Sequence, residues 1–374
     1  MDLELQSEHR ALRETVRAFA DQVIRPLAAG IDREHRFPAQ VIAAAAELDL
    51  LGTLVPEDYG GAGMDHLAFT LCIEEIARAC ASCAVIIDVH SSVGSEPIVL
   101  FGTEEQKRTW LPALAAGRVL GAFCLSEPGS GSDAASLQAS AHHDGAGWVL
   151  TGTKTFITNI GEAGLYTVFA RSAEGISAFL VPGDAPGLRV GQVFRKMGLN
   201  GSPTGELVLD EVRVGAGALL HAPGQGFQVA MRALDSGRIG ISGQALGIAG
   251  AALEEGAAFL RERRQFDRPL ASFQGLQFMV ADMGTRLEAA RRLAYHAAWL
   301  CDQGRPFTKE ASMAKLFCTD TAMAVATDAV QLGGGYGFTQ ELALERHFRD
   351  AKALQIYEGS NQVQRIVIAR DVLR

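Results

Sequence analysis

The stretch GWVLTGTKTFIT, residues 147–158, decides the fold, because it is rich in β-branched and aromatic residues within a chain whose pattern is otherwise mostly helical. Three more runs of this kind follow at residues 165–171, 176–181 and 205–214, and Gly, Asp and Pro turns separate them. The region between about residues 121 and 214 is therefore predicted to form a separate β domain.

Helical patterns lie on both sides of this region. From Glu8 to about Ala116, apolar residues recur at helical spacing, with breaks at prolines and at Gly60-Gly61. After the turn at residues 223–226, Ala-rich and Leu-rich segments cover residues 227–263, 272–302, 308–331, 340–353 and 360–371. Their small residues permit close packing within and between subunits, so we expect an oligomer.

The predicted fold is α+β and mainly α. It has an N-terminal α-helical domain at residues 1–118, a middle antiparallel β domain at 119–222 and a C-terminal four-helix-bundle domain at 223–374. The order of helices, sheet and helices argues against a doubly wound parallel sheet. No G-x-G-x-x-G motif follows a strand, so a dinucleotide cofactor would need another mode of binding.

Composition excludes several classes of protein. Of 374 residues, 48% are hydrophobic and 21% charged, which excludes a disordered chain, and the net charge of −9 disfavours nucleic-acid binding. The longest uncharged helical stretch, Ile239 to Leu253, is too short for a membrane span. Residues 1–4 run into an amphipathic pattern with acids in its first turn, unlike a secretory signal, so we expect a cytoplasmic protein.

The six cysteines are too few for a disulfide scaffold. Cys80 and Cys83 have the spacing of a redox pair or half a zinc site, but the sequence has no second such pair. We interpret them as core residues and predict no metal site.

Glu358, in the segment IYEGSNQVQR at 356–365, is the candidate base. It follows an apolar approach and precedes a glycine. Burial would raise its pKa toward neutrality, whereas the N-terminus of the following helix would lower it. On spacing alone, the alternative is a helix-capping loop with Ser360 as the N-cap.

This segment and five others together resemble the acyl-CoA dehydrogenase family. The others are FCLSEPGSGSD at 123–133, KTFITN at 154–159, RERRQF at 261–266, FQGLQ at 273–277 and QLGGGYG at 331–337. The resemblance covers nearly the whole chain in the same order. It implies an FAD enzyme that converts an acyl-CoA to the trans-2-enoyl-CoA, with Glu358 removing the α-proton while a hydride leaves the β-carbon for flavin N5.

The resemblance also implies the ligand contacts. Those to FAD fall on Phe123, Leu125, Ser126, Gly131, Ser132, Phe156, Ile157, Thr158, Arg263, Gln265, Phe266, Phe273, Gln274, Gln331, Leu332, Gly334, Gly335, Ser360 and Gln362. Those to the substrate fall on Ser132, Asp235, Arg238, Tyr357 and Gly359. Without the resemblance, the same residues have structural interpretations. The Gly-Ser loop would be a plain turn, the run at 154–159 a strand in the core and Arg263 an exposed arginine at a helix end, and Asp235 and Arg238 would form a surface ion pair.

Three positions qualify the resemblance. Phe156 stands where tryptophan is commoner, and Asp267 replaces a usual glycine, which leaves that turn uncertain. Some relatives carry the base at the position of Gly237, and glycine cannot act as a base there.

The run at 234–254, together with the runs at 101–107 and 345–352, looks most like the short-chain, butyryl-CoA branch. Residues 90–97 contain no Arg or Lys, which disfavours a diacid substrate.

The family implies an electron-transferring flavoprotein as acceptor and a homotetramer built as a dimer of dimers. In the family, the segments around Arg263 and Gln331 reach a neighbouring subunit's FAD. Three alternatives share these motifs: an acyl-CoA oxidase, an acyl-carrier-protein-linked dehydrogenase of a biosynthetic pathway, and a flavin-binding protein without activity.

Overall fold

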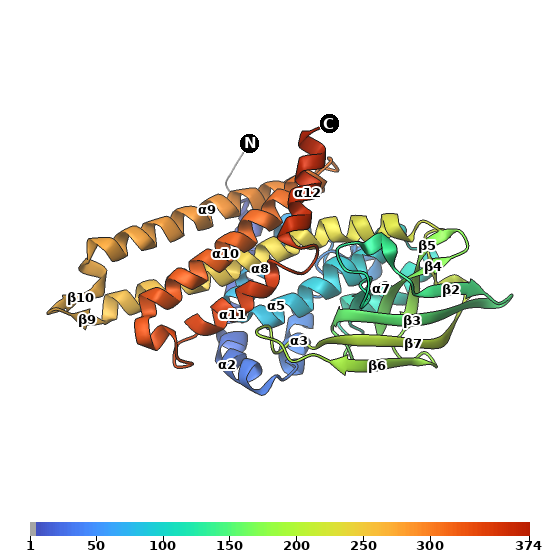
Figure 1. Cartoon of the computed structure of the whole chain (residues 1–374), viewed down its shortest axis with the longest axis horizontal. Helices are drawn as coiled ribbons and strands as arrows, with labels where there is room; N and C mark the ends of the chain where they lie inside the picture. Colours follow the sequence, from blue (N-terminus) through green and yellow to red (C-terminus); the bar gives the residue numbers. More distant parts are fainter. Residues whose placement is uncertain (1–4) are drawn as a thin grey trace.

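The first third of the chain is a set of packed helices. The computed structural model describes residues 5–374 and places these helices against the middle of the molecule (Figure 1). Asp65 caps α4, and the Thr103–Gln106 capping box begins α7. The α-helices are α1 (Ser7–Phe19), α2 (Arg25–Glu34), α3 (Ala39–Ala46), α4 (His66–Ala79), α5 (Ala81–Asp88), α6 (Glu96–Phe101) and α7 (Glu104–Ala115).

The middle third forms a sheet at one end of the molecule (Figure 1). Its strands are β1 (Gly121–Cys124), β2 (Ser140–His143), β3 (Gly147–Thr158), β4 (Leu165–Ser172), β5 (Gly175–Pro182), β6 (Leu188–Val193), β7 (Thr204–Gly215) and β8 (Leu219–Leu220). The order is β6-β7-β3-β2-β4-β5-β8, with β1 beside β4. The four runs expected from the sequence become β3, β4, β5 and β7.

The prediction of an antiparallel sheet is wrong in one respect. Strand β1 pairs with β4 in parallel, with Gly121 opposite Leu165, and β2 also touches β4 in parallel, so the sheet is mixed. The long connection through β2 and β3 allows this, because parallel neighbours need a crossover and not a tight hairpin. Strand β1 is too short for its pairing to be recognised in the sequence.

The last third is a helical bundle. It contains α8 (Gly226–Glu262), α9 (Gln274–Asp302), α10 (Thr308–Gly337), α11 (Leu344–Leu354) and α12 (Asn361–Val372), with a hairpin of β9 (Arg264–Gln265) and β10 (Arg268–Pro269) after α8. Buried alanines on α8 and α10, including Ala249 and Ala326, allow these helices to pack closely. Helix α10 runs beyond the expected end at residue 331, and a non-helical Gly334 kinks it.

The changes of secondary structure fall near the expected places. Helix α7 ends at Ala115 before β1 begins at Gly121, and β8 ends at Leu220 before α8 begins at Gly226. The domain limits at 118/119 and 222/223 remain predictions. The features expected of residues 1–4 lie outside the described residues.

Burial explains two compositional features. Within residues 5–374, one stretch, Ala81–Phe101, is long and apolar enough to cross a membrane, contrary to the expectation from uncharged runs, and 83% of its apolar window is buried inside the fold. The stretch is this apolar because Asp88 and Glu96 are its only Asp, Glu, Lys or Arg residues. Cys80 and Cys83 are buried free thiols, as predicted for core residues.

Candidate active site

Glu358 lies in the loop between α11 and α12, and its carboxylate meets the middle of α8. The Ser360 side chain accepts a hydrogen bond from the N–H of Val363 at 3.4 Å, so the predicted N-cap is confirmed. Glu358 has a φ of +52°, and Gly359 follows with a φ of +88°. A residue with a Cβ pays on the order of 1–3 kcal/mol for such a backbone, and strain of this kind gathers at functional sites. The loop therefore both caps α12 and turns the acid inward.

The Glu358 carboxylate is buried against bare helix backbone. A Cβ at Gly237 would overlap Oε2 and come within 3.0 Å of Cδ, so glycine leaves the space that this acid occupies and any larger residue would displace the carboxylate. Both carboxylate oxygens are shielded from solvent, and neither has a hydrogen-bond partner among residues 5–374. A buried acceptor left unpaired costs about 1–3 kcal/mol, which marks this carboxylate as one kept free for a ligand.

Two cations face the carboxylate. Burial raises the pKa of Glu358 to about 7, while the charges of Lys315 and Arg238 pull it down. Burial also lowers the pKa of Lys315 to about 7, against the favourable charge of Glu358. Glu358 thus gains and loses its proton near neutrality, where a general base works best.

Lys315 and Gln364 hold the backbone of the acid loop, and sequence analysis missed both. The Lys315 Nζ donates to the Gly359 carbonyl and to Asn361 Oδ1, each at 3.0 Å. The Gln364 Nε2 donates to the carbonyls of Glu358, at 3.2 Å, and Gly359, at 2.8 Å. For Lys315 the only available signal was a lysine among the alanines and other apolar residues of α10, since its pairing with the loop spans more than forty residues.

The predicted ion pair on α8 is present but buried. The Arg238 guanidinium donates to Asp235 Oδ1 at 2.6 Å, and Asp235 Oδ2 accepts from Thr308 Oγ1 at 2.6 Å. The alternative of a surface ion pair is wrong, because α4, α9 and α10 pack around α8 and leave Asp235 8% and Arg238 5% exposed. Of the residues expected to contact substrate, Asp235, Arg238 and Gly359 lie around Glu358, and its chain neighbour Tyr357 donates its hydroxyl proton to Gln244 Oε1.

A second group of predicted residues lies at the sheet. This sheet-side set comprises Phe123, Leu125, Ser126, Gly131, Ser132, Phe156, Ile157 and Thr158, on β1, β3 and the loop after β1. A bulge between Lys154 and Ile157 gives Phe156 a φ of +57° and leaves its ring 69% exposed. Ile157, by contrast, packs its side chain into the sheet core, so only its backbone is available to a ligand.

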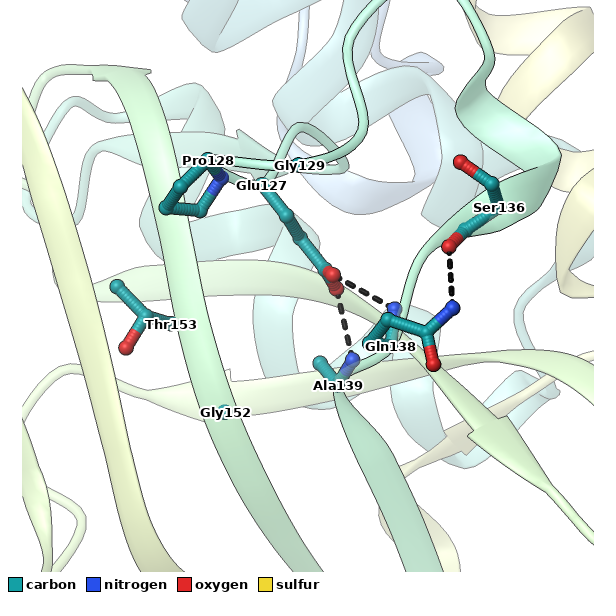
Figure 2. A pocket seen from close by; sticks show the side chains of 8 residues that line it. All are labelled: Glu127, Pro128, Gly129, Ser136, Gln138, Ala139, Gly152 and Thr153. Atoms are coloured by element: carbon teal, nitrogen blue, oxygen red, sulfur yellow. Dashed lines mark hydrogen bonds between the residues drawn. The ribbon is translucent and has the colours of Figure 1, made fainter.

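A buried ion pair anchors this loop. The Lys154 Nζ donates to Glu127 Oε1 at 2.7 Å and to the Leu125 carbonyl at 3.2 Å. The Glu127 carboxylate also accepts from the N–H groups of Gln138 and Ala139, and these bonds are drawn in Figure 2. Glu127 lines an open pocket of about 480 Å³ between the loop and β3. The loop carrying Ser126 and Gly131 is therefore held rigidly on the sheet.

The remaining residues expected to bind FAD lie mostly at the opposite end of the molecule. This hairpin-side set comprises Arg263, Gln265, Phe266, Phe273, Gln274, Gln331, Leu332, Gly334 and Gly335. Phe266 and Asp267 both have positive φ and form the two-residue turn between β9 and β10, which settles the turn at the unusual Asp267. A second pocket, of about 500 Å³, is lined by Arg263, Leu332, Gly334 and Gly335, among others.

One chain does not bring these two sets together. Figure 1 shows the β9–β10 hairpin at one end of the long α8–α9–α10 bundle and the sheet at the other. Ser360 and Gln362, also expected to contact FAD, lie at the start of α12, between the two ends (Figure 1). A single bound molecule therefore cannot contact both sets within one subunit.

Comparisons with known proteins agree with this architecture. Family models described as acyl-CoA dehydrogenase N-terminal, middle and C-terminal domains match residues 6–118, 122–212 and 224–373. The mitochondrial short-chain specific acyl-CoA dehydrogenase of Bos taurus is 46% identical over 100% of this chain and 92% of its own length.

Two solved structures are also closely similar. Butyryl-CoA dehydrogenase from Megasphaera elsdenii superposes with a TM-score of 0.98 at 40% identity, with 100% of both chains covered. A chain in a structure reported for the electron transferring flavoprotein of Acidaminococcus fermentans has a TM-score of 0.99 at 43% identity, also with 100% of both chains covered.

Proposed function

Since the chain belongs to the acyl-CoA dehydrogenase family, we propose that it oxidises a short-chain acyl-CoA to the trans-2-enoyl-CoA, with Glu358 as the base that removes the α-proton. The observation that carries this proposal is the Glu358 carboxylate, which is buried, unpartnered among residues 5–374 and has a pKa of about 7. A thioester α-proton is weakly acidic, and a desolvated carboxylate facing it is a stronger base than one in water.

FAD is the cofactor of this family, and the residues of this chain fit it. The exposed Phe156 offers an aromatic face, and Arg263 offers two donors to a pyrophosphate. At Gly334 and Gly335, an added Cβ would have no atom of the described residues within 4 Å apart from the chain neighbours and the backbone of its own helix, so a ligand can approach the backbone there. When bound, FAD supplies the acceptor for the hydride that leaves the β-carbon.

The residues around Glu358 have separate tasks. Glu358 takes the α-proton, and its backbone N–H is the proposed donor to the thioester oxygen, where a preorganised donor is worth roughly 3–4 kcal/mol. Lys315 donates to the Gly359 carbonyl, Gln364 donates to the carbonyls of Glu358 and Gly359, and these bonds orient the loop. Asp235 and Arg238 are the proposed contacts to the CoA portion.

The separation of the two FAD-binding sets supports an oligomer. The sheet-side set of one subunit needs a hairpin-side set to complete its site, and a second subunit is the proposed source. We therefore propose a homotetramer built from two such dimers, with a cytoplasmic location. The likeness to a chain in a structure reported for an electron transferring flavoprotein supports such a flavoprotein as the electron acceptor.

Reduction of the bound flavin tests the function. Butyryl-CoA added under nitrogen should bleach the visible flavin band of the holoenzyme. Glu358→Gln should keep the yellow cofactor and lose essentially all bleaching and turnover, whereas Glu14→Gln, an identical change at an exposed residue of α1, should behave as wild type. An active Glu358→Gln enzyme would refute the assignment, and peroxide formation in air would indicate an oxidase.

A further inference from the structure

A second buried carboxyl group faces the same helix as Glu358. Asp88 is the last residue of α5 and has no solvent exposure. A Cβ at Gly240 would come within 2.7 Å of the Asp88 Cγ, just as one at Gly237 would overlap Glu358. Gly237 and Gly240 are three residues apart and lie on one face of α8, so the two acids are neighbours about one helical turn apart.

Asp88 is only partly satisfied by the protein. Its Oδ1 accepts from Ser92 Oγ at 3.1 Å, and Oδ2 is buried with no partner in the described part of the chain. The Gln244 amide, four residues after Gly240 on α8, bonds to the Tyr357 hydroxyl and, at 2.9 Å, to the Ala81 carbonyl. A buried oxygen left in this state costs about 1–3 kcal/mol unless a ligand pairs with it.

The charge state of Asp88 determines which ligand group suits it. Burial, and then the charge of Glu358, raise the pKa of Asp88 well above its usual value. A neutral carboxyl group both donates and accepts hydrogen bonds, so it pairs well with a hydroxyl group. An unsubstituted hydrocarbon tail gives it no partner.

We propose that Asp88 is a specificity-determining residue that recognises a hydroxyl group on the acyl chain beyond the β-carbon. The inference rests on the proposed function, because it takes Glu358 as the group that meets the α-carbon. Asp88 is offset from Glu358 by about 5 Å along α8, roughly one helical turn, and this offset is comparable to the span from the α-carbon to a hydroxyl group on the γ-carbon. The preferred substrates are therefore short hydroxyacyl thioesters.

A nearly isosteric pair of thioesters tests this inference. 4-Hydroxybutyryl-CoA and pentanoyl-CoA differ by a hydroxyl in place of a methyl group. We expect the wild-type holoenzyme to favour the hydroxylated compound roughly tenfold in kcat/KM, the value of one good hydrogen bond. Asp88→Ala should abolish this preference, and Asp88→Asn should keep part of it, because an amide also donates and accepts.

Controls separate this inference from the proposed function. Val93→Ala enlarges the same region, since Val93 also faces Gly237, without changing its polarity, so the substrate ratio should stay near that of wild type. Flavin content checks the folding of each variant. A wild-type preference for pentanoyl-CoA, or an Asp88→Ala ratio equal to that of wild type, would overturn the role of Asp88 while flavin bleaching by butyryl-CoA still upholds dehydrogenation. If no acyl-CoA bleaches the flavin, both proposals fail.

Discussion

Replacing Gly237 by alanine is expected to slow turnover about a hundredfold while the protein stays folded and yellow. The new Cβ would lie 3.0 Å from the Glu358 Cδ and 3.1 Å from the Val93 Cγ1, whereas non-bonded carbon atoms prefer about 3.5–4.0 Å. The carboxylate must therefore move about 0.5–1 Å away from α8. A displacement of about 1 Å at a reacting group costs on the order of 100-fold in rate.

The assay is steady-state kcat with butyryl-CoA, measured together with flavin content and Tm. Gly250→Ala is the matched control, because it lies on the same helix and, apart from the chain neighbours and the backbone of that helix, no described atom lies within 4 Å of the added Cβ. That control should keep its activity and gain up to about 1 kcal/mol in stability, as expected for Ala over Gly in a helix. A Gly237→Ala enzyme with wild-type kcat would show that the position of Glu358 against α8 does not limit the reaction.

Three other outcomes follow from the charges. If Glu358 is the base, as proposed, it acts as its anion, and its pKa of about 7 makes kcat/KM rise with pH through about 7 and then level off, whereas a flat profile between pH 5.5 and 8.5 would contradict this. Lys315→Met removes a cation that lowers the pKa of Glu358, so that rising limb should move to higher pH by about one unit, and an unmoved limb would exclude the coupling. Lys154→Met leaves the Glu127 carboxylate buried without its cation, which should cost about 3–5 kcal/mol in urea unfolding, whereas Lys107→Met on α7 should cost far less.

The candidate base and Arg238 beside it could be predicted, but Lys315 and Asp88 could not. Glu358 lies within the short run at residues 356–365, and a motif of adjacent residues can be recognised in a sequence. Lys315 and Asp88 come from separate helices and have no local motif around them. The Asp235–Arg238 pair shows the same limit, because i,i+3 spacing establishes that two charges share a face and cannot establish whether another helix covers it.

Local chemistry was sufficient for the order of helices and strands, since hydrophobic periodicity, β-branched runs, capping residues and turns act over a few residues each. It was also sufficient for the Ser360 cap. Other features depend on contacts between residues far apart in the chain. These are the partners of each strand, the parallel pairing of β1, the burial of the ion pair on α8 and the position of Glu358 next to Asp88. Their free energies are set by desolvation and close packing, which exist only once the elements have assembled.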